Sequence, residues 1–332
     1  MPDDGGDDAG FLPALLGDGR PLLLATAAAL FFSGGFAVFL AASKELLPQD
    51  VRYLGMTAGD LCAVRSCRIL DFMVHDRAAF GGALLGLGVL YTWLTLFPLS
   101  NHEQWAWWTW LVSGVVGFAT FLAYLGYGYL DTWHGAGTLL LLPVFAAGMW
   151  RSRRLVGPLR VRGAFRADVG ASRLARRQEW GRTVLLGGAA ATAIGGLAIL
   201  RIGLTDTFVP EDLEFIGLSA SDLRAINPHL VPLIAHDRAG FGGGVFTLGL
   251  ITLLCLWCAR PSRHLRQAVA TAGLLSLSAA LGVHMTVGYT DRWHLVPPAV
   301  AAGLLVIGLA LWRSPPAPTA PSPARGRPRP GA

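Results

Sequence analysis

The sequence contains two polar motifs, and each of them occurs twice. Segment 75–82 reads His-Asp-Arg-Ala-Ala-Phe-Gly-Gly, and segment 236–243 reads His-Asp-Arg-Ala-Gly-Phe-Gly-Gly. Segments 128–134 and 288–294 share the pattern Gly-Tyr-x-Asp-x-Trp-His. Both motifs recur at an almost constant interval of about 160 residues, which marks an internal duplication. The chain is therefore expected to fold as two similar halves, and the shared His, Asp and Arg residues are the first candidates for function.

The composition excludes an ordinary soluble protein. Of 332 residues, 53% are hydrophobic and only 14% are charged, and the mean hydropathy is +0.49. So little polar surface predicts an all-α polytopic membrane protein. A spanning helix needs about 20 apolar residues. By this criterion we predict eight transmembrane helices, near 21–43, 79–99, 106–130, 135–150, 184–203, 239–258, 268–290 and 295–312.

The duplication and the composition together divide the chain. The predicted parts are a disordered N-terminal tail 1–20, a four-helix membrane repeat 21–150, an Arg-rich linker 151–182, a second four-helix membrane repeat 183–313 and a disordered Pro-rich tail 314–332.

The first apolar run ends in small residues, as a cleaved signal peptide does, but it lacks a basic region in front. Its segment 34–38 also matches 195–199 in the other half, so we predict a permanent span.

The arginines set the expected orientation. Segment 151–182 contains ten arginines against Asp168 and Glu179. Further arginines follow the sixth and eighth spans, at Arg260, Arg263, Arg266, Arg313, Arg325, Arg327 and Arg329. By the positive-inside rule these regions are cytoplasmic, which predicts a multi-pass protein of the plasma (inner) membrane with both termini inside and two parallel repeats. The net charge of +6 is then explained by contact with anionic membrane lipid, and nucleic acid is not an expected partner.

An outer segment between the first two spans of each half carries a helix-start signal. Segments 48–61 and 210–223 run in parallel, and in each a Thr or Ser precedes an aspartate by three positions. The pairs are Thr57 with Asp60 and Ser219 with Asp222. This spacing predicts a capping box and a short helix lying over the outer ends of the spans. Asp60 and Asp222 are therefore interpreted as structural residues.

The four cysteines fall into two pairs. Cys62 and Cys67 lie in the outer segment, where an oxidising compartment permits a disulfide. Residues five apart lie on different faces of a regular helix, so this bridge requires the helix to end near Arg65. Cys255 and Cys258 lie in an apolar span and are interpreted as small core residues.

Without any ligand, the two motifs of each half would form a structural clasp. Each places ionisable groups near the outer membrane boundary, where such groups pair or line a wet cavity. The clasp pairs would be Arg77 with Asp131, Asp76 with His134, Arg238 with Asp291 and Asp237 with His294. Tyr129 and Tyr289 are interpreted as interfacial anchors, as are Trp133 and Trp293.

Three ligand-binding hypotheses compete with this clasp. A divalent metal would take two His and two Asp in each half, from His75, Asp76, Asp131 and His134 or from His236, Asp237, Asp291 and His294. Two b-type haems would take His75 with His134 and His236 with His294 as axial ligands. In a transport or lipid-binding cavity, Arg77 and Arg238 would attract an anionic group while the carboxylates and histidines carry protons.

We favour a small-ligand or metal-binding transporter-like protein, with membrane lipid and a small molecule or ion as partners. Neither copy has lost a charged member of the motifs, whereas a duplicated enzyme commonly keeps one catalytic copy. A membrane-embedded enzyme, either metal-dependent and lipid-active or quinone-linked, is the alternative. A structural scaffold is the third hypothesis.

One family resemblance adds to these hypotheses. Four spans, a surface helix after the first, and the segment Arg77 to Gly88 opening the second resemble the DoxX-like four-helix membrane proteins, with a repeat at 238–243. The resemblance covers about one span per half and implies a quinone-linked redox role. The Gly-Tyr-x-Asp-x-Trp-His element departs from that family's pattern, so no residue role is carried over.

Overall fold

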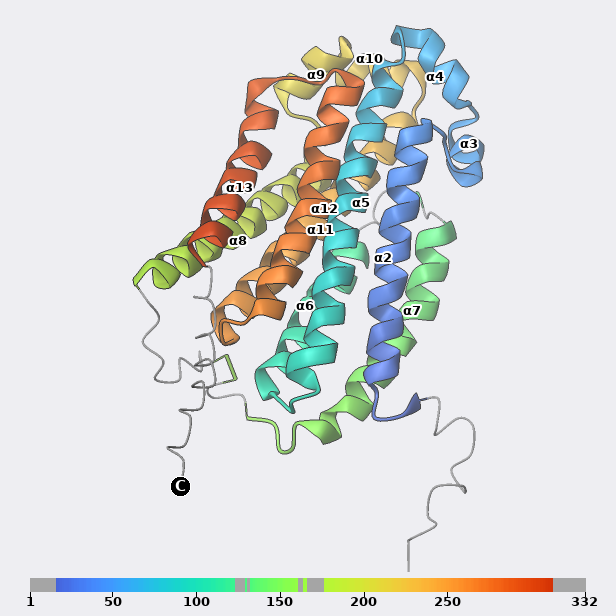
Figure 1. Cartoon of the computed structure of the whole chain (residues 1–332). Helices are drawn as coiled ribbons and strands as arrows, with labels where there is room; N and C mark the ends of the chain where they lie inside the picture. The colour runs from blue at the N-terminus through green and yellow to red at the C-terminus, as the bar shows by residue number, and fades with distance from the viewer. Residues whose placement is uncertain (1–15, 123–128, 130–131, 161–163, 166–175, 313–332) are drawn as a thin grey trace, which may run out of the picture.

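The computed structural model describes residues 16–122, 129, 132–160, 164–165 and 176–312, and in these ranges it is helical without strands. Figure 1 shows long helices packed side by side, with short helices gathered at one end. The long helices are α2 (Arg20–Ser43), α5 (Arg68–Leu94), α6 (Gln104–Leu122), α7 (Thr132–Ser152), α8 (Arg176–Leu204), α11 (Leu230–Cys258), α12 (Arg263–Val287) and α13 (Arg292–Leu311).

Six helices of the described chain are long and apolar enough to cross a membrane. These are α2, α8, α11, α12, α13 and the stretch Arg68–Leu99, in which the π-helical segment η1 (Thr95–Leu99) continues α5. Helices α5 and α11 are the most buried of the six. They contact each other, and α2 and α12 pack on α5 while α8 and α6 pack on α11. The fold therefore places the two helices that carry the His-Asp-Arg motifs in the middle of an apolar bundle.

Both central helices begin about three turns earlier than the hydropathy predicts. Helix α5 starts at Arg68 and α11 at Leu230, whereas the predicted spans start near 79 and 239. Both His-Asp-Arg motifs, which precede the predicted spans, therefore lie inside their helices. Hydropathy excludes charged residues from a span, but here each charge has a partner inside the protein.

The short outer helices have the predicted caps. They are α3 (Pro48–Leu54), α4 (Ala58–Arg65), α9 (Pro210–Ile216) and α10 (Ala220–Ile226), and Figure 1 shows them together at one end of the bundle. The capping boxes of α4 and α10 are confirmed, since Asp60 accepts from the Thr57 backbone N–H at 2.7 Å and Asp222 from that of Ser219 at 2.9 Å. The backbone and side-chain hydrogen bonds of Thr57 hold the pKa of the exposed Asp60 below its usual range, and the side-chain and backbone hydrogen bonds of Ser219 do the same for the exposed Asp222.

The cysteines lie as their sequence context indicates. Helix α4 ends at Arg65, and Ser66 and Cys67 both have left-handed backbone conformations. This reversal brings Cys67 back to Cys62, and the two form a disulfide. Cys255 and Cys258 are free thiols buried in the core.

Candidate functional site

The two His-Asp-Arg motifs face each other across the contact between α5 and α11, and their charges pair crosswise. Arg77 Nε donates to Asp237 Oδ2 at 2.7 Å, and Arg238 Nε donates to Asp76 Oδ2 at 3.0 Å. Each arginine thus pairs with the aspartate of the other copy. Sequence analysis expected pairs within each half, and this crossed arrangement corrects that expectation.

A second carboxylate reaches each arginine from a short outer helix. Asp50 of α3 lies 2.9 Å from Arg77 Nη1, and Asp212 of α9 bonds to Arg238 Nη1. Both aspartates also cap their helices, accepting from the backbone N–H of Leu47 at 3.1 Å and of Val209 at 2.9 Å. Proline at the first helical position and aspartate at the third give each helix this start. The matching Pro-x-Asp in segments 48–61 and 210–223 is the signal that could have identified these residues.

Both tyrosines of the second motif bond to these same aspartates. The Tyr129 hydroxyl donates to Asp50 Oδ1, and the Tyr289 hydroxyl donates to Asp212 Oδ1 at 2.8 Å. Their exposed fractions are only 5% and 1%, so their interpretation as interfacial anchors is wrong. Burial and the neighbouring Asp212 raise the pKa of Tyr289 well above its ordinary value, so the phenol remains a hydrogen-bond donor.

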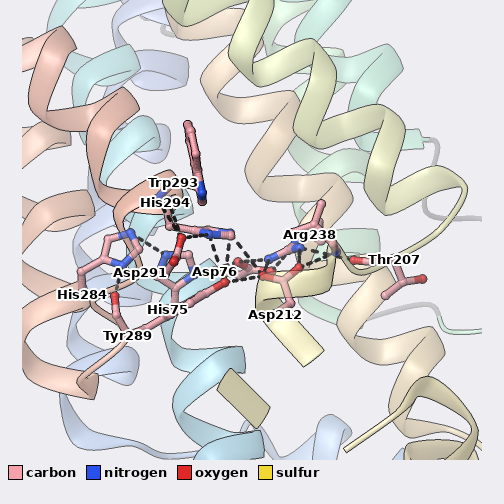
Figure 2. A network of polar contacts seen from close by, with 11 residues as sticks. His75, Asp76, Thr207, Asp212, Arg238, His284, Tyr289, Asp291, Trp293 and His294 are labelled. Atoms are coloured by element: carbon pink, nitrogen blue, oxygen red, sulfur yellow. Dashed lines mark hydrogen bonds and ion pairs between the residues drawn. The ribbon is translucent and has the colours of Figure 1, made fainter. Parts of the chain in front are cut away.

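These contacts define two charged clusters, each built from both halves of the sequence. The first cluster is Asp50, Arg77, Tyr129, His236 and Asp237. The second cluster, drawn in Figure 2, is His75, Asp76, Asp212, Arg238, His284, Tyr289 and His294. In the second, Arg238 also lies 4.8 Å from the centre of the Phe72 ring. The side chain of His134, the sequence counterpart of His294, and the whole of Asp131 lie outside the described residues.

Two histidines of the second cluster face each other through their Nε2 atoms, which are 3.1 Å apart. His75 Nδ1 lies 3.0 Å from Asp76 Oδ1, and His284 Nδ1 lies 2.6 Å from the Tyr289 carbonyl oxygen. Both ring nitrogens of each histidine therefore have a polar partner inside the protein.

Asp212 is the most heavily partnered carboxylate of the second cluster. It has no exposed surface, and it lies 3.2 Å from His294 Nε2 in addition to its contacts with Arg238 and Tyr289. Burial by itself raises the pKa of Asp212, but the hydrogen bond from His294 and the charge of Arg238 outweigh burial and hold the pKa well below its usual range. Asp212 is consequently ionised in the folded protein.

The remaining residues that were predicted to bind a ligand do not lie together in one site. Asp291 caps α13 by accepting from the backbone N–H groups of Trp293 and His294, so the predicted Arg238 to Asp291 pair is wrong. His236 and Asp237 belong to the first cluster and His294 to the second, which contradicts the metal set of the second half. Within the described residues, no group of three or more His, Cys, Asp or Glu suits a metal ion.

The expected attraction of anions is also corrected by the geometry. Each arginine is flanked by two carboxylates, Arg77 by Asp50 and Asp237 and Arg238 by Asp76 and Asp212. The guanidinium charge is already neutralised, and a third negative group would meet repulsion from the two carboxylates. Any charge recognition at these clusters therefore favours protons or cations.

A large cavity adjoins the first cluster. It has a volume of about 680 Å³ and lies among α2, α5, α6, α7 and α11. Arg77 and Asp237 form the charged part of its wall, and most of the rest is apolar or aromatic. Small-molecule sites commonly have volumes of about 300–1,000 Å³ with a few polar groups in an apolar lining. The cavity is therefore large enough for a small organic ligand.

The DoxX-like resemblance remains a prediction. Comparison of the chain with protein-family models, with curated proteins and with solved structures finds no significant match.

Proposed function

We propose that the chain is a transporter-like integral membrane protein that binds a small ligand in the cavity beside the first cluster. The observation that carries this proposal is the partly buried Arg77–Asp237 pair on the wall of a cavity of about 680 Å³. A charged pair in an apolar bundle is costly to desolvate and is by default a candidate functional group. The two crossed pairs join the helices α5 and α11, so a ligand at one pair can alter the contact between the two halves of the bundle.

The proposed architecture has eight spans in two parallel four-helix repeats. Helices α6 and α7 lie within the same bundle as the six apolar helices, which supports their crossing the membrane too (Figure 1). The equivalent contacts of Asp50 and Asp212, and of Arg77 and Arg238, support the repeat. By the positive-inside rule, the arginines of 151–182 support a cytoplasmic linker, with the short outer helices on the opposite side of the plasma membrane.

A cysteine-labelling experiment tests this orientation. A cysteine introduced at Gly170, in the linker, should resist an impermeant thiol reagent in intact cells, and one at the exposed Ser221 of α10 should react. The unsubstituted protein gives the background, and lysed cells should label at Gly170. Labelling at Gly170 with protection at Ser221 would place both clusters near the cytoplasmic face.

Filling the cavity tests the ligand site. Gly117 of α6 lines the cavity, and a Cβ there would meet only Thr247, at 3.5 Å. Gly117→Leu should fold normally, because the added side chain has room, and should reduce the small molecules that copurify with the protein, measured by native mass spectrometry. Gly303→Leu is the matched control, since Gly303 is exposed on α13 with nothing within 4 Å of its Cβ position. If neither variant changes what copurifies, the clusters act as a structural clasp.

A further inference from the structure

We propose that the cavity beside the first cluster holds the chain of a membrane lipid, which enters sideways from the bilayer between α2 and α7. This inference rests on the proposed function, which makes the cavity a ligand site, and it adds the chemical class of the ligand. Three features of the cavity support it: its elongated shape, the position of its polar groups and its exposed side wall.

The cavity is a long slot that runs along the helices. Its lining residues extend from Thr26 to Leu40 on α2 and from Arg77 to Tyr91 on α5. At about 1.5 Å per residue, each of these stretches is about 21 Å long. A sphere of 680 Å³ would be only about 11 Å across. Each leaflet accounts for about half of the roughly 30 Å hydrocarbon core of a bilayer, so the slot is long enough for an extended lipid chain.

The charged groups of the slot lie at one end of it. Arg77 and Asp237 are the first lining residues of α5 and α11, at the end of the bundle that carries the short outer helices. At the opposite end, Tyr91 and Trp110 line the slot, and the Tyr91 hydroxyl already donates to Ser113 Oγ at 2.9 Å. A membrane lipid has the same polarity, with its oxygen-bearing end at the surface and its chain below. The guanidinium donates and the carboxylate accepts hydrogen bonds, so the pair can hold that end without selecting a net charge.

The wall between α2 and α7 gives a route from the bilayer. Phe32 and Phe36 of α2 and Leu140 of α7 line the slot and are also 73%, 51% and 72% exposed on the surface of the bundle. Farther from the short outer helices the two helices are in contact, since a Cβ at Gly148 of α7 would lie 2.9 Å from the Leu23 side chain of α2. In a membrane the exposed apolar wall faces acyl chains. A lipid chain can therefore move into the slot without passing through water, where its apolar surface is unfavourable.

Native mass spectrometry of the protein released from nanodiscs tests the inference. The nanodiscs would contain one lipid, a phosphatidylcholine with two oleoyl chains, and collisional activation would strip the lipids on the outside of the bundle. We expect a single lipid to remain on the unsubstituted protein and its retained fraction to fall severalfold in Gly137→Phe. Gly137 is an exposed lining residue of α7 with nothing within 4 Å of its Cβ position, so the ring has room and narrows the side opening. Gly303→Phe is the matched control, because Gly303 of α13 is equally open and lies outside the slot.

Two further variants separate the lipid from the site. Gly117→Leu should also remove the retained lipid, whereas Gly188→Leu, which fills the apolar cavity of about 100 Å³ in the second half, should leave it in place.

The outcomes distinguish the two proposals. Absence of a retained lipid from the unsubstituted protein, or equal retention in Gly137→Phe, would overturn the sideways entry of a lipid. If a water-soluble molecule is retained instead and is lost in Gly117→Leu, the cavity remains a ligand site and only the lipid assignment is wrong. If Gly117→Leu removes nothing that the unsubstituted protein retains, the proposed function fails as well.

Discussion

Replacing Arg238 with alanine is expected to destabilise the folded protein by about 3–5 kcal/mol, because removal of one partner leaves buried charges uncompensated. Arg238 is 4% exposed, and the two carboxylates it contacts, Asp76 and Asp212, are 1% and 0% exposed. The cation also stacks on the Phe72 ring, and that contact is lost too. We expect a large fall in the midpoint of thermal unfolding, measured on the purified protein in a single detergent.

Two comparisons isolate this effect. Arg224→Ala removes the same side chain from an exposed position on α10 and should change the midpoint little. In a double-mutant cycle, Arg238→Ala and Asp76→Asn should be non-additive, because both remove the same ion pair across α5 and α11. Additive losses in this cycle would mean that the pair contributes no interaction energy and that the crossed arrangement does not hold the two helices together.

Local signals predicted the outer helices well. The Thr57 to Asp60 and Ser219 to Asp222 spacings depend only on neighbours in the chain, and both capping boxes form. The Cys62 to Cys67 disulfide requires the helix to end near Arg65, and this requirement also depends only on neighbouring residues in the chain. Such features need no knowledge of what packs against the segment.

The partners of the charged motifs could not be predicted in the same way. The duplication identified His75, Asp76 and Arg77 as important, but it suggested that each half is complete on its own. In the structure Arg77 pairs with Asp237, which is far away in sequence. Which helix of the second half lies beside α5 is decided by packing across the whole bundle, and hydropathy contains no information about it.

The same limitation explains the errors on Tyr129 and Tyr289. Tyrosine near the end of a span is commonly an interfacial anchor, and composition alone favours that interpretation. Here both hydroxyl groups donate to aspartates on short outer helices, Asp50 and Asp212. The retention of these two aspartates at equivalent positions of the parallel segments 48–61 and 210–223 was the available signal.

Close packing of backbones explains two glycines of the contact between α8 and α11, Gly196 and Gly242. A Cβ at Gly196 of α8 would lie 2.1 Å from the Phe246 backbone nitrogen of α11, and one at Gly242 would lie 2.2 Å from the Leu200 backbone nitrogen of α8. These neighbours are backbone atoms and cannot rotate away. Small residues at helix interfaces in membranes permit this approach. The contact between α8 and α11 therefore depends on the absence of side chains at both positions.

Alanine substitutions at two adjacent glycines of α8 should therefore change the stability of the protein in opposite directions. Gly196→Ala is expected to cost about 3 kcal/mol or more, at or above the upper end of overpacking penalties, because the two helices must move apart. Gly195→Ala adds a Cβ with nothing within 4 Å and should stabilise the helix by about 0.5–1 kcal/mol through its lower backbone entropy in the unfolded chain. Thermal midpoints of the two variants, purified side by side, measure the difference. Equal midpoints would show that α8 and α11 do not approach this closely, and the placement of α11 between α8 and α5 would then need revision.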